Sequence, residues 1–272
     1  MKIAAAQMDI AWHNRRANHA KIRHMAEAAK ARGVDLVIFP EMCATGFSMD
    51  SHVTAEPLDG PTPTLFRNLA RDLHLAVVGG FALDTQGERP RNVSLSVDSQ
   101  GRDLALYAKI HLIGLLNEDR YYNPGNHTVS FHVAGAEVSC LICYDLRFPE
   151  VFRSLAERCS MIVVIASWPS VRQSHWDILL PARAVENQLY VTGVNRVGQG
   201  GGHLFTGGSA IIDPAGRVLA HAGNRETLLI AEIDPQQVKE IRSAMPFLKD
   251  RRNALFQPGE SVSQRMKNTP PP

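Results

Sequence analysis

The feature that most constrains the fold of this chain is a series of short apolar runs, separated by helical segments and tight turns. One of these runs, residues 34–40, is closed by Pro40, and all of them are short enough for strands bounded by turn or helix signals. This pattern predicts buried strands from one end of the chain to the other. The predicted strands are residues 2–8, 34–40, 76–82, 161–167, 189–195 and 228–233.

Amphipathic segments and hairpins lie between these strands. In residues 15–32, Ile22, Met25, Ala26 and Ala29 recur at helical spacing, with basic residues between them. The predicted helices are residues 15–32, 64–75, 149–159, 175–188 and 235–244. Alternating stretches with glycine at the turn predict hairpins over residues 92–109, 127–143 and 209–223.

The order of these segments predicts a single α/β domain over residues 1–260. Hairpins and strand–helix–strand units both occur, so we expect a mixed sheet or two sheets. Residues 261–272, which end in three prolines, are expected to form a flexible tail. Residues 198–209 are rich in glycine, and we expect a mobile loop there near the mouth of a pocket.

The charge balance does not indicate a polyanionic partner. The chain has 272 residues, of which 29 are basic and 27 acidic, so we expect neither nucleic acid nor a membrane surface as a partner. Gln7 and Asp9 interrupt the apolar N-terminus, and no run reaches the roughly 18 apolar residues of a membrane helix. We therefore expect a cytoplasmic protein.

Three functional groups stand where predicted strands end: Glu41, Lys109 and Cys143. Strand ends are where α/β proteins collect catalytic groups. A thiol is mostly protonated at neutral pH, so it needs a base, which Glu41 can supply. Lys109 and the backbone N–H of Tyr144 can stabilise the oxyanion of a tetrahedral intermediate. Taken singly, each residue also fits an ordinary structural role.

The segments FPEM, YAKIHL and LICYDLRFPE around these three residues resemble the signatures of the nitrilase superfamily of carbon–nitrogen hydrolases. The resemblance covers about residues 1–260. It implies a four-layer α-β-β-α sandwich and a cysteine amidase that needs no cofactor and no metal. It also implies a small-molecule amide and water as substrates, and a homodimer or larger homo-oligomer.

The same resemblance implies a second glutamate between the lysine and cysteine segments. Glu118 matches it and would hold Lys109, although the adjacent Asp119 is an alternative. Residues 168–198, together with CYDLRFP, resemble the omega-amidase-like branch, whose substrates are 2-oxoglutaramate and 2-oxosuccinamate. These substrates carry a carboxylate, which an arginine can bind through two hydrogen bonds.

We expect Arg172 to bind that carboxylate; the alternative is that it is an ordinary surface arginine. Trp168 and Phe47 are expected to line the pocket. Arg147 and Arg183 are expected to brace the fold instead. The remaining two polar candidates near the motifs, Asp145 and His111, are expected to be structural, the former at a helix start or in a salt bridge.

Other functions stay open at this level. Within the same chemistry they are a deaminated-glutathione amidase, an N-carbamoyl amino acid hydrolase or an aliphatic amidase. A catalytically inactive ligand-binding scaffold is a different class. A redox or metal protein would use the Cys140 and Cys143 pair, but residues three apart on a strand point to opposite faces and no second ligand pair is present.

Overall fold

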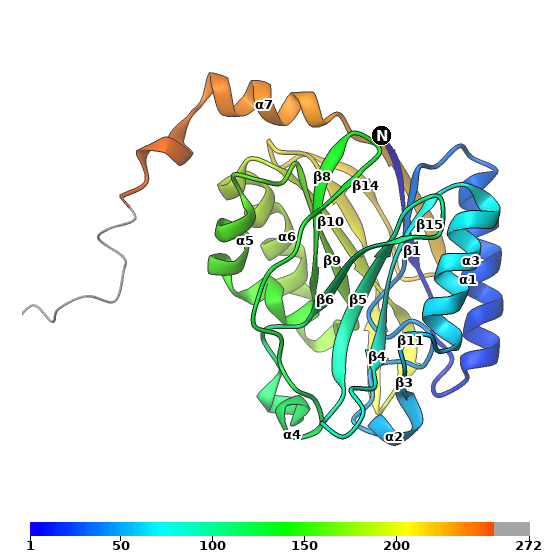
Figure 1. The fold of residues 1–272 in the computed structure, drawn as a ribbon. Helices are drawn as coiled ribbons and strands as arrows, with labels where there is room; N and C mark the ends of the chain where they lie inside the picture. Colours follow the sequence, from blue (N-terminus) through cyan, green and yellow to red (C-terminus); the bar gives the residue numbers. More distant parts are fainter. Residues whose placement is uncertain (253–272) are drawn as a thin grey trace, which may run out of the picture.

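A computed structural model describes residues 1–252, and two β-sheets face each other between two layers of helices (Figure 1). The first sheet has the order β15 (Thr227–Glu232), β1 (Lys2–Gln7), β2 (Leu36–Ile38), β4 (Ala76–Leu83), β5 (Arg91–Val97) and β6 (Asp103–Ala108), with β3 (Ala55–Glu56) beside β4. The second has the order β14 (Val218–His221), β13 (Ala210–Ile212), β10 (Tyr190–Asn195), β9 (Met161–Ala166), β8 (Ala136–Ile142) and β7 (Phe131–Val133). This is the predicted α-β-β-α sandwich.

The first sheet is apolar on both faces, which explains why its strands read as nearly continuous hydrophobic runs. Along β1, Ile3 and Ala5 belong to the core between the two sheets, whereas Ala4 and Ala6 belong to the core under the outer helices. Successive residues of a strand point to opposite faces, so both sets are buried at once. The sandwich therefore has one core between the sheets and another beneath α1 and α3.

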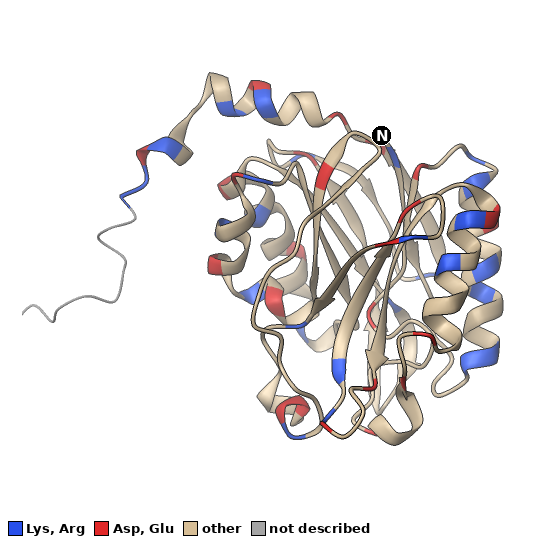
Figure 2. Ribbon diagram, in the orientation of Figure 1, with Lys and Arg blue, Asp and Glu red and all other residues tan. Residues whose placement is uncertain are grey.

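Helices cover the outer faces of both sheets (Figure 1). On the first sheet lie α1 (Arg15–Lys30) and α3 (Pro61–Leu73), and on the second lie α5 (Pro149–Leu155) and α6 (Gln173–Asn187). The shorter helical segments are α2 (Ser51–Thr54), α4 (Glu118–Tyr121), η1 (Gly114–Leu116), η2 (Cys143–Arg147), η3 (Ser170–Arg172) and η4 (Phe247–Asp250). In Figure 2 the charged residues lie mostly on the outer helices and loops, while the strands between them are mostly uncharged.

α1 illustrates how local sequence sets a helix. Asn14 caps it by accepting a hydrogen bond from the Ala17 N–H, and Ile22, Met25 and Ala29 are buried on its inner face. α7 (Pro235–Ala244) has the predicted bounds and projects from the sandwich at the top of Figure 1. No helix within residues 1–252 has the length and hydropathy that crossing a membrane requires.

The expectation of a loop at residues 198–209 is wrong. This stretch forms a two-stranded hairpin of β11 (Val197–Gly200) and β12 (His203–Thr206). Its turn is Gly201-Gly202, where both φ angles are positive, at 56° and 79°. A two-residue turn of this kind favours glycine at both positions, so the glycines form a hairpin rather than a loop. The predicted flexible tail, residues 261–272, lies outside the described residues.

Candidate active site

The ends of several strands from both sheets meet at one place in the sandwich. β2 runs parallel to β4 and leads to Glu41, while β8 and β9 run parallel and lead to Cys143 and Ser167. The Ser167 N–H donates to Glu41 Oε2 at 2.8 Å, so a hydrogen bond joins the two sheets here. Lys109 follows β6 and completes the group from the edge of the first sheet.

The backbone of β4 approaches Glu41 closely at Gly80. A Cβ added to Gly80 would lie 2.8 Å from the Glu41 Cα and 2.8 Å from an Ile165 methyl carbon. Because both neighbours belong to the packed interior, a larger residue at this position would displace either Glu41 or β9. Glycine is therefore required for the close approach of the two strand ends.

A fully buried ion cluster forms around Lys109. Its Nζ donates to Glu41 Oε1 at 3.1 Å and to the two oxygens of Glu118 at 3.0 and 2.9 Å. None of the three charged side chains reaches solvent. The pKa of Lys109 is raised because Glu118 and Glu41 outweigh the opposing effect of burial, so the ammonium stays protonated. The pKa of Glu118 is raised by burial, which Lys109 opposes.

Cys143 occupies a strained position directly after β8. It is the first residue of η2 and has a φ of 47°, in the left-handed region that residues with a Cβ seldom adopt. Burial and then the negative charge of Glu41 raise the pKa of its thiol, while Lys109 opposes them. The thiol is thus protonated at neutral pH, and a base must remove its proton before sulfur can attack a carbon.

The turn that carries Cys143 is held by Asp145, which is completely buried. Asp145 accepts hydrogen bonds from the Ile142 N–H, from the Tyr107 hydroxyl at 2.7 Å, and from both the backbone and the ring of His111. The expectation that Asp145 starts a helix or forms a salt bridge is confirmed. His111 is structural as expected, since its ring also stacks on Phe148 with centroids 3.7 Å apart.

A small cavity opens onto Cys143. Residues predicted from the sequence that line it are Phe47, Cys143, Tyr144, Trp168 and Arg172. Ile113, Leu116, Arg147, Ser167 and Pro169 complete the lining.

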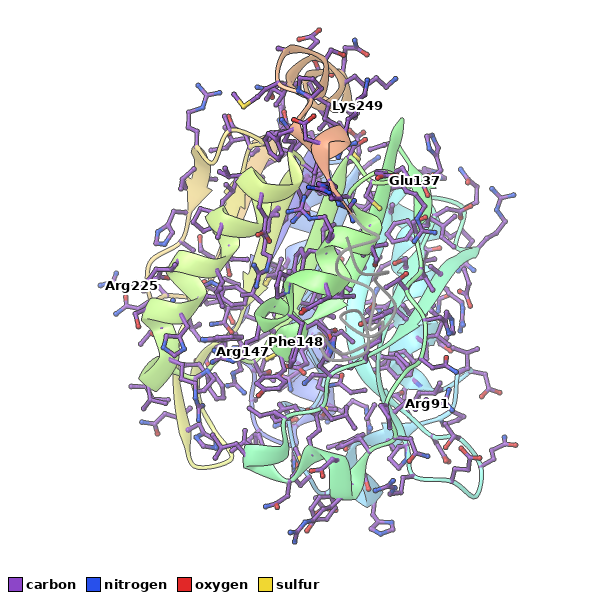
Figure 3. The ribbon with its side chains drawn as sticks, turned by 90° about the vertical axis from the view of Figure 1, so that its left-hand side faces the viewer. Arg91, Glu137, Arg147, Phe148, Arg225 and Lys249 are labelled. Carbon is purple, nitrogen blue, oxygen red and sulfur yellow. The ribbon has the colours of Figure 1, made fainter. Side chains whose placement is uncertain are left out.

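Arg147 has a position at the cavity that the sequence does not predict, in addition to a contact with His175 that fits its expected bracing role. It lines the cavity, its guanidinium lies 4.6 Å from the centre of the Trp168 ring, and Figure 3 places it beside Phe148. Arg183 does brace the fold, because it donates to the Leu146 carbonyl.

The cavity holds more positive charge than the residues around it neutralise. Within residues 1–252, neither Arg147 nor Arg172 forms an ion pair with a carboxylate. Burial lowers the pKa of Arg147, and the charge of Arg172 lowers it further. Two unpaired guanidinium groups at one cavity are suited to an anionic ligand.

Sequence reasoning missed two contributors to the ion cluster. Asn92 donates to Glu41 and Glu118, and Ser167 donates through its backbone to Glu41. Asn92 lies across the β5–β6 hairpin from Lys109, whose N–H donates to the Asn92 carbonyl. A polar residue opposite a candidate lysine in a predicted hairpin was the only available signal for it.

Comparisons with known families, sequences and structures each find relatives of this chain. Residues 2–243 match the family described as carbon-nitrogen hydrolase. The 2-oxoglutaramate amidase of Bacillus subtilis (strain 168) is 32% identical over 256 residues, which cover 93% of this chain and 98% of that protein. The omega-amidase YafV of Escherichia coli (strain K12) is 32% identical over 253 residues, covering 92% and 96%.

A solved structure of an amidase is also closely similar. It is a glutamate-to-glutamine mutant of the amidase from Nesterenkonia sp. AN1, with a TM-score of 0.85 and 29% identity over 94% of this chain and 95% of that chain. In that protein the acetamide moiety of fluoroacetamide is covalently added at the active-site cysteine. The similarity therefore extends across both sheets and the strand ends that meet between them.

Proposed function

Because this chain belongs to the carbon–nitrogen hydrolase family, we propose that it hydrolyses the terminal amide of small ω-amides such as 2-oxoglutaramate and 2-oxosuccinamate. Ammonia leaves, and the acyl group passes through a thioester on Cys143. The observation that carries the proposal is the buried Lys109, held between Glu41 and Glu118 and exerting its charge on the Cys143 thiol.

In the first half-reaction, Glu41 takes the thiol proton while the Cys143 sulfur attacks the amide carbon. The carbonyl oxygen becomes an oxyanion, which the charge of Lys109 and the backbone N–H of Tyr144 stabilise. Glu41 then gives its proton to the amide nitrogen, the C–N bond breaks, and ammonia departs. The acyl group remains on sulfur.

In the second half-reaction, water attacks the thioester carbon and Glu41 accepts a proton from that water. The C–S bond breaks and the proton returns to sulfur, which restores the thiol and releases the carboxylic acid. Glu118 keeps Lys109 in place throughout, because it accepts from Nζ through both oxygens and is itself held by the Ile113 N–H at 2.8 Å.

The choice of an amide with a distant carboxylate is supported by Arg147 and Arg172. Both line the cavity that opens onto Cys143, and neither has an acidic partner within residues 1–252. A carboxylate bound between them would place the other end of a short substrate at the sulfur. The two relatives named above as 2-oxoglutaramate amidase and omega-amidase support the same substrate class.

We further propose that residues 1–260 act as one hydrolase domain and that the protein is a homodimer or larger homo-oligomer. The outer face of α6, which faces the viewer in Figure 3, supports the second proposal. Ile178 and Val185 lie two turns apart on this helix and expose 65% and 47% of their surface. An exposed apolar stripe on a helix is suited to packing against another helix.

The proposed function is tested by measuring ammonia release from a panel of amides. The panel contains 2-oxoglutaramate, 2-oxosuccinamate, an N-carbamoyl amino acid, deaminated glutathione and a neutral aliphatic amide, with Cys143→Ala as the inactive control. We expect the first two to be hydrolysed with the highest kcat/KM. Faster hydrolysis of any other member would reject the substrate class, and no hydrolysis of any member would reject the activity.

A further inference from the structure

Asn92 connects the two glutamates of the ion cluster. Its side chain is completely buried, and its Nδ2 donates to Glu41 Oε1 at 2.7 Å and to Glu118 Oε1 at 3.0 Å. The same two oxygens accept hydrogen bonds from Lys109 Nζ. The amide and the ammonium therefore share one acceptor oxygen on each carboxylate.

The orientation of the Asn92 amide is determined by its surroundings. Reversing the amide would place its oxygen against two carboxylate oxygens, which cannot donate when they are ionised. Its Oδ1 makes no hydrogen bond to any described residue, so the donors alone fix the side chain. The backbone is fixed too, because Asn92 pairs with Ala82 on β4 and accepts from the Lys109 N–H at 2.9 Å.

Glu41 and Glu118 differ in how many of their acceptor positions are occupied. An ionised carboxylate has about four lone-pair positions, two on each oxygen. Glu118 uses all four, since Oε1 accepts from Asn92 and Lys109 while Oε2 accepts from Lys109 and the Ile113 N–H. Within residues 1–252, Glu41 uses three, because its Oε2 accepts only from the Ser167 N–H there.

Glu41 Oε2, which has the vacant position, is bonded to the residue whose N–H also reaches the nucleophile. The Ser167 N–H, which donates to Oε2, also lies close enough to the Cys143 sulfur to favour the thiolate. Ser167 and Cys143 both line the small cavity. Asn92 acts on Glu41 through Oε1, the oxygen that the Ser167 N–H does not contact.

We propose that Asn92 is a positioning residue that gives the two oxygens of Glu41 different tasks. Together with Lys109 it fills the lone pairs of Oε1 and anchors that oxygen, which leaves Oε2 as the oxygen that takes the Cys143 proton. It also supplies a neutral donor to two acids that share a single ammonium. This inference rests on the proposed function only in making Glu41 the base.

The test is the pH dependence of acylation in Asn92→Leu, which keeps the side-chain volume and removes both donors. The reporter substrate is p-nitrophenyl acetate, because acylation of a thiol by this activated ester needs no protonation of the leaving group. In the plot of kcat/KM against pH, we expect the acidic limb to shift to higher pH by about one to two units. Each lost hydrogen bond to a charged group favours the protonated acid. We also expect kcat to fall about 10²-fold with KM nearly unchanged.

Asn18→Leu is the matched control. Asn18 is also completely buried and its Nδ2 donates to two carbonyls, those of Ala11 and Ala44, at 2.8 Å each. Its loss should lower the melting temperature without moving the acidic limb. If Asn92→Leu does not fold, Asn92→Ala, which also removes both donors, is judged by the same criterion.

An unchanged acidic limb in the folded Asn92 variant would overturn the proposal. Failure of the proposed function is recognised separately, because wild-type protein would then release p-nitrophenol through Cys143 and yet hydrolyse no amide in the panel. A limb that moves equally in the Asn18 and Asn92 variants would also overturn the proposal, since it would indicate a general loss of packing.

Discussion

Lys109 and Glu118 form a bidentate ion pair in the interior, with the ammonium nitrogen 3.0 and 2.9 Å from the two carboxylate oxygens. Both side chains are fully shielded from solvent. Lys109 is the only ammonium or guanidinium group that pairs with Glu41 or Glu118 within residues 1–252. The stability of the site and its catalytic charge therefore depend on the same residue.

Replacing Lys109 with methionine should lower both stability and activity. Two buried carboxylates lose their cation, which costs about 3–5 kcal/mol of unfolding free energy when a buried pair is broken. Loss of the oxyanion stabiliser should lower kcat by about 10²–10³. Urea denaturation and ammonia release measure the two effects.

The stability loss in Lys109→Met should shrink as the pH falls from 7 toward 4, because the acids can then become neutral. A variant with near-wild-type turnover would remove Lys109 from the mechanism. A stability loss that does not change with pH would show that the carboxylates are not the groups left unpaired.

Glu41→Gln should separate thiol ionisation from catalysis. Burial and then the charge of Glu41 raise the pKa of Cys143, so removing that charge should lower the pKa, although burial still keeps it high. Turnover should nevertheless be lost, because glutamine cannot accept the thiol proton.

The thiolate absorbance near 240 nm, followed against pH with Cys143→Ala as the blank, measures the ionisation. The predicted result is a thiolate signal that appears at lower pH than in the wild type. A signal displaced to higher pH would mean that Glu41 stabilises the thiolate, contrary to the electrostatics described above.

Arg172→Met should selectively impair the hydrolysis of amides that carry a carboxylate. A charge-assisted hydrogen bond to a carboxylate contributes enough that KM for 2-oxoglutaramate should rise about 10- to 100-fold. The KM for a neutral aliphatic amide should stay within about twofold, because no charged contact is lost. Arg147→Met tests the second arginine in the same assay, and equal effects on both substrates would reject carboxylate recognition.

Ile178→Asp on the outer face of α6 should shift the protein toward monomers. The side chain is 65% exposed in the single chain, so the substitution leaves the core intact while placing a charge in the proposed contact. Light scattering after size exclusion gives the mass. Val53→Asp is the control, since Val53 is 45% exposed on α2, and an unchanged mass in Ile178→Asp would exclude this face.

Much of the fold could be predicted from the sequence because local patterns determine it. Apolar runs such as residues 161–167 and the periodic helix at 15–32 appear close to their predicted bounds. Glu41, Lys109 and Cys143 could be placed at strand ends for the same reason. The hairpin at Gly201-Gly202 does not follow from the sequence in the same way, because adjacent glycines fit a loop as well as a two-residue turn.

The remaining parts of the site depend on contacts between distant segments. Asn92 reaches Glu41 across 51 residues of sequence and Ser167 reaches it across 126, so no local pattern marks either. Arg147 is four residues from Cys143, but its contact with the Trp168 ring joins two separate segments of the chain, which no local pattern marks. The cytoplasmic location stays a prediction.

The most direct test of the mechanism is the mass of the protein trapped during turnover. Acid quenching of wild-type enzyme mixed with 2-oxoglutaramate, followed by intact-mass analysis and peptide mapping, should show one acyl group on Cys143, absent from Cys143→Ala. An acyl group on Cys43, Cys140 or Cys159 instead, or ammonia release that continues in Cys143→Ala, would contradict the account.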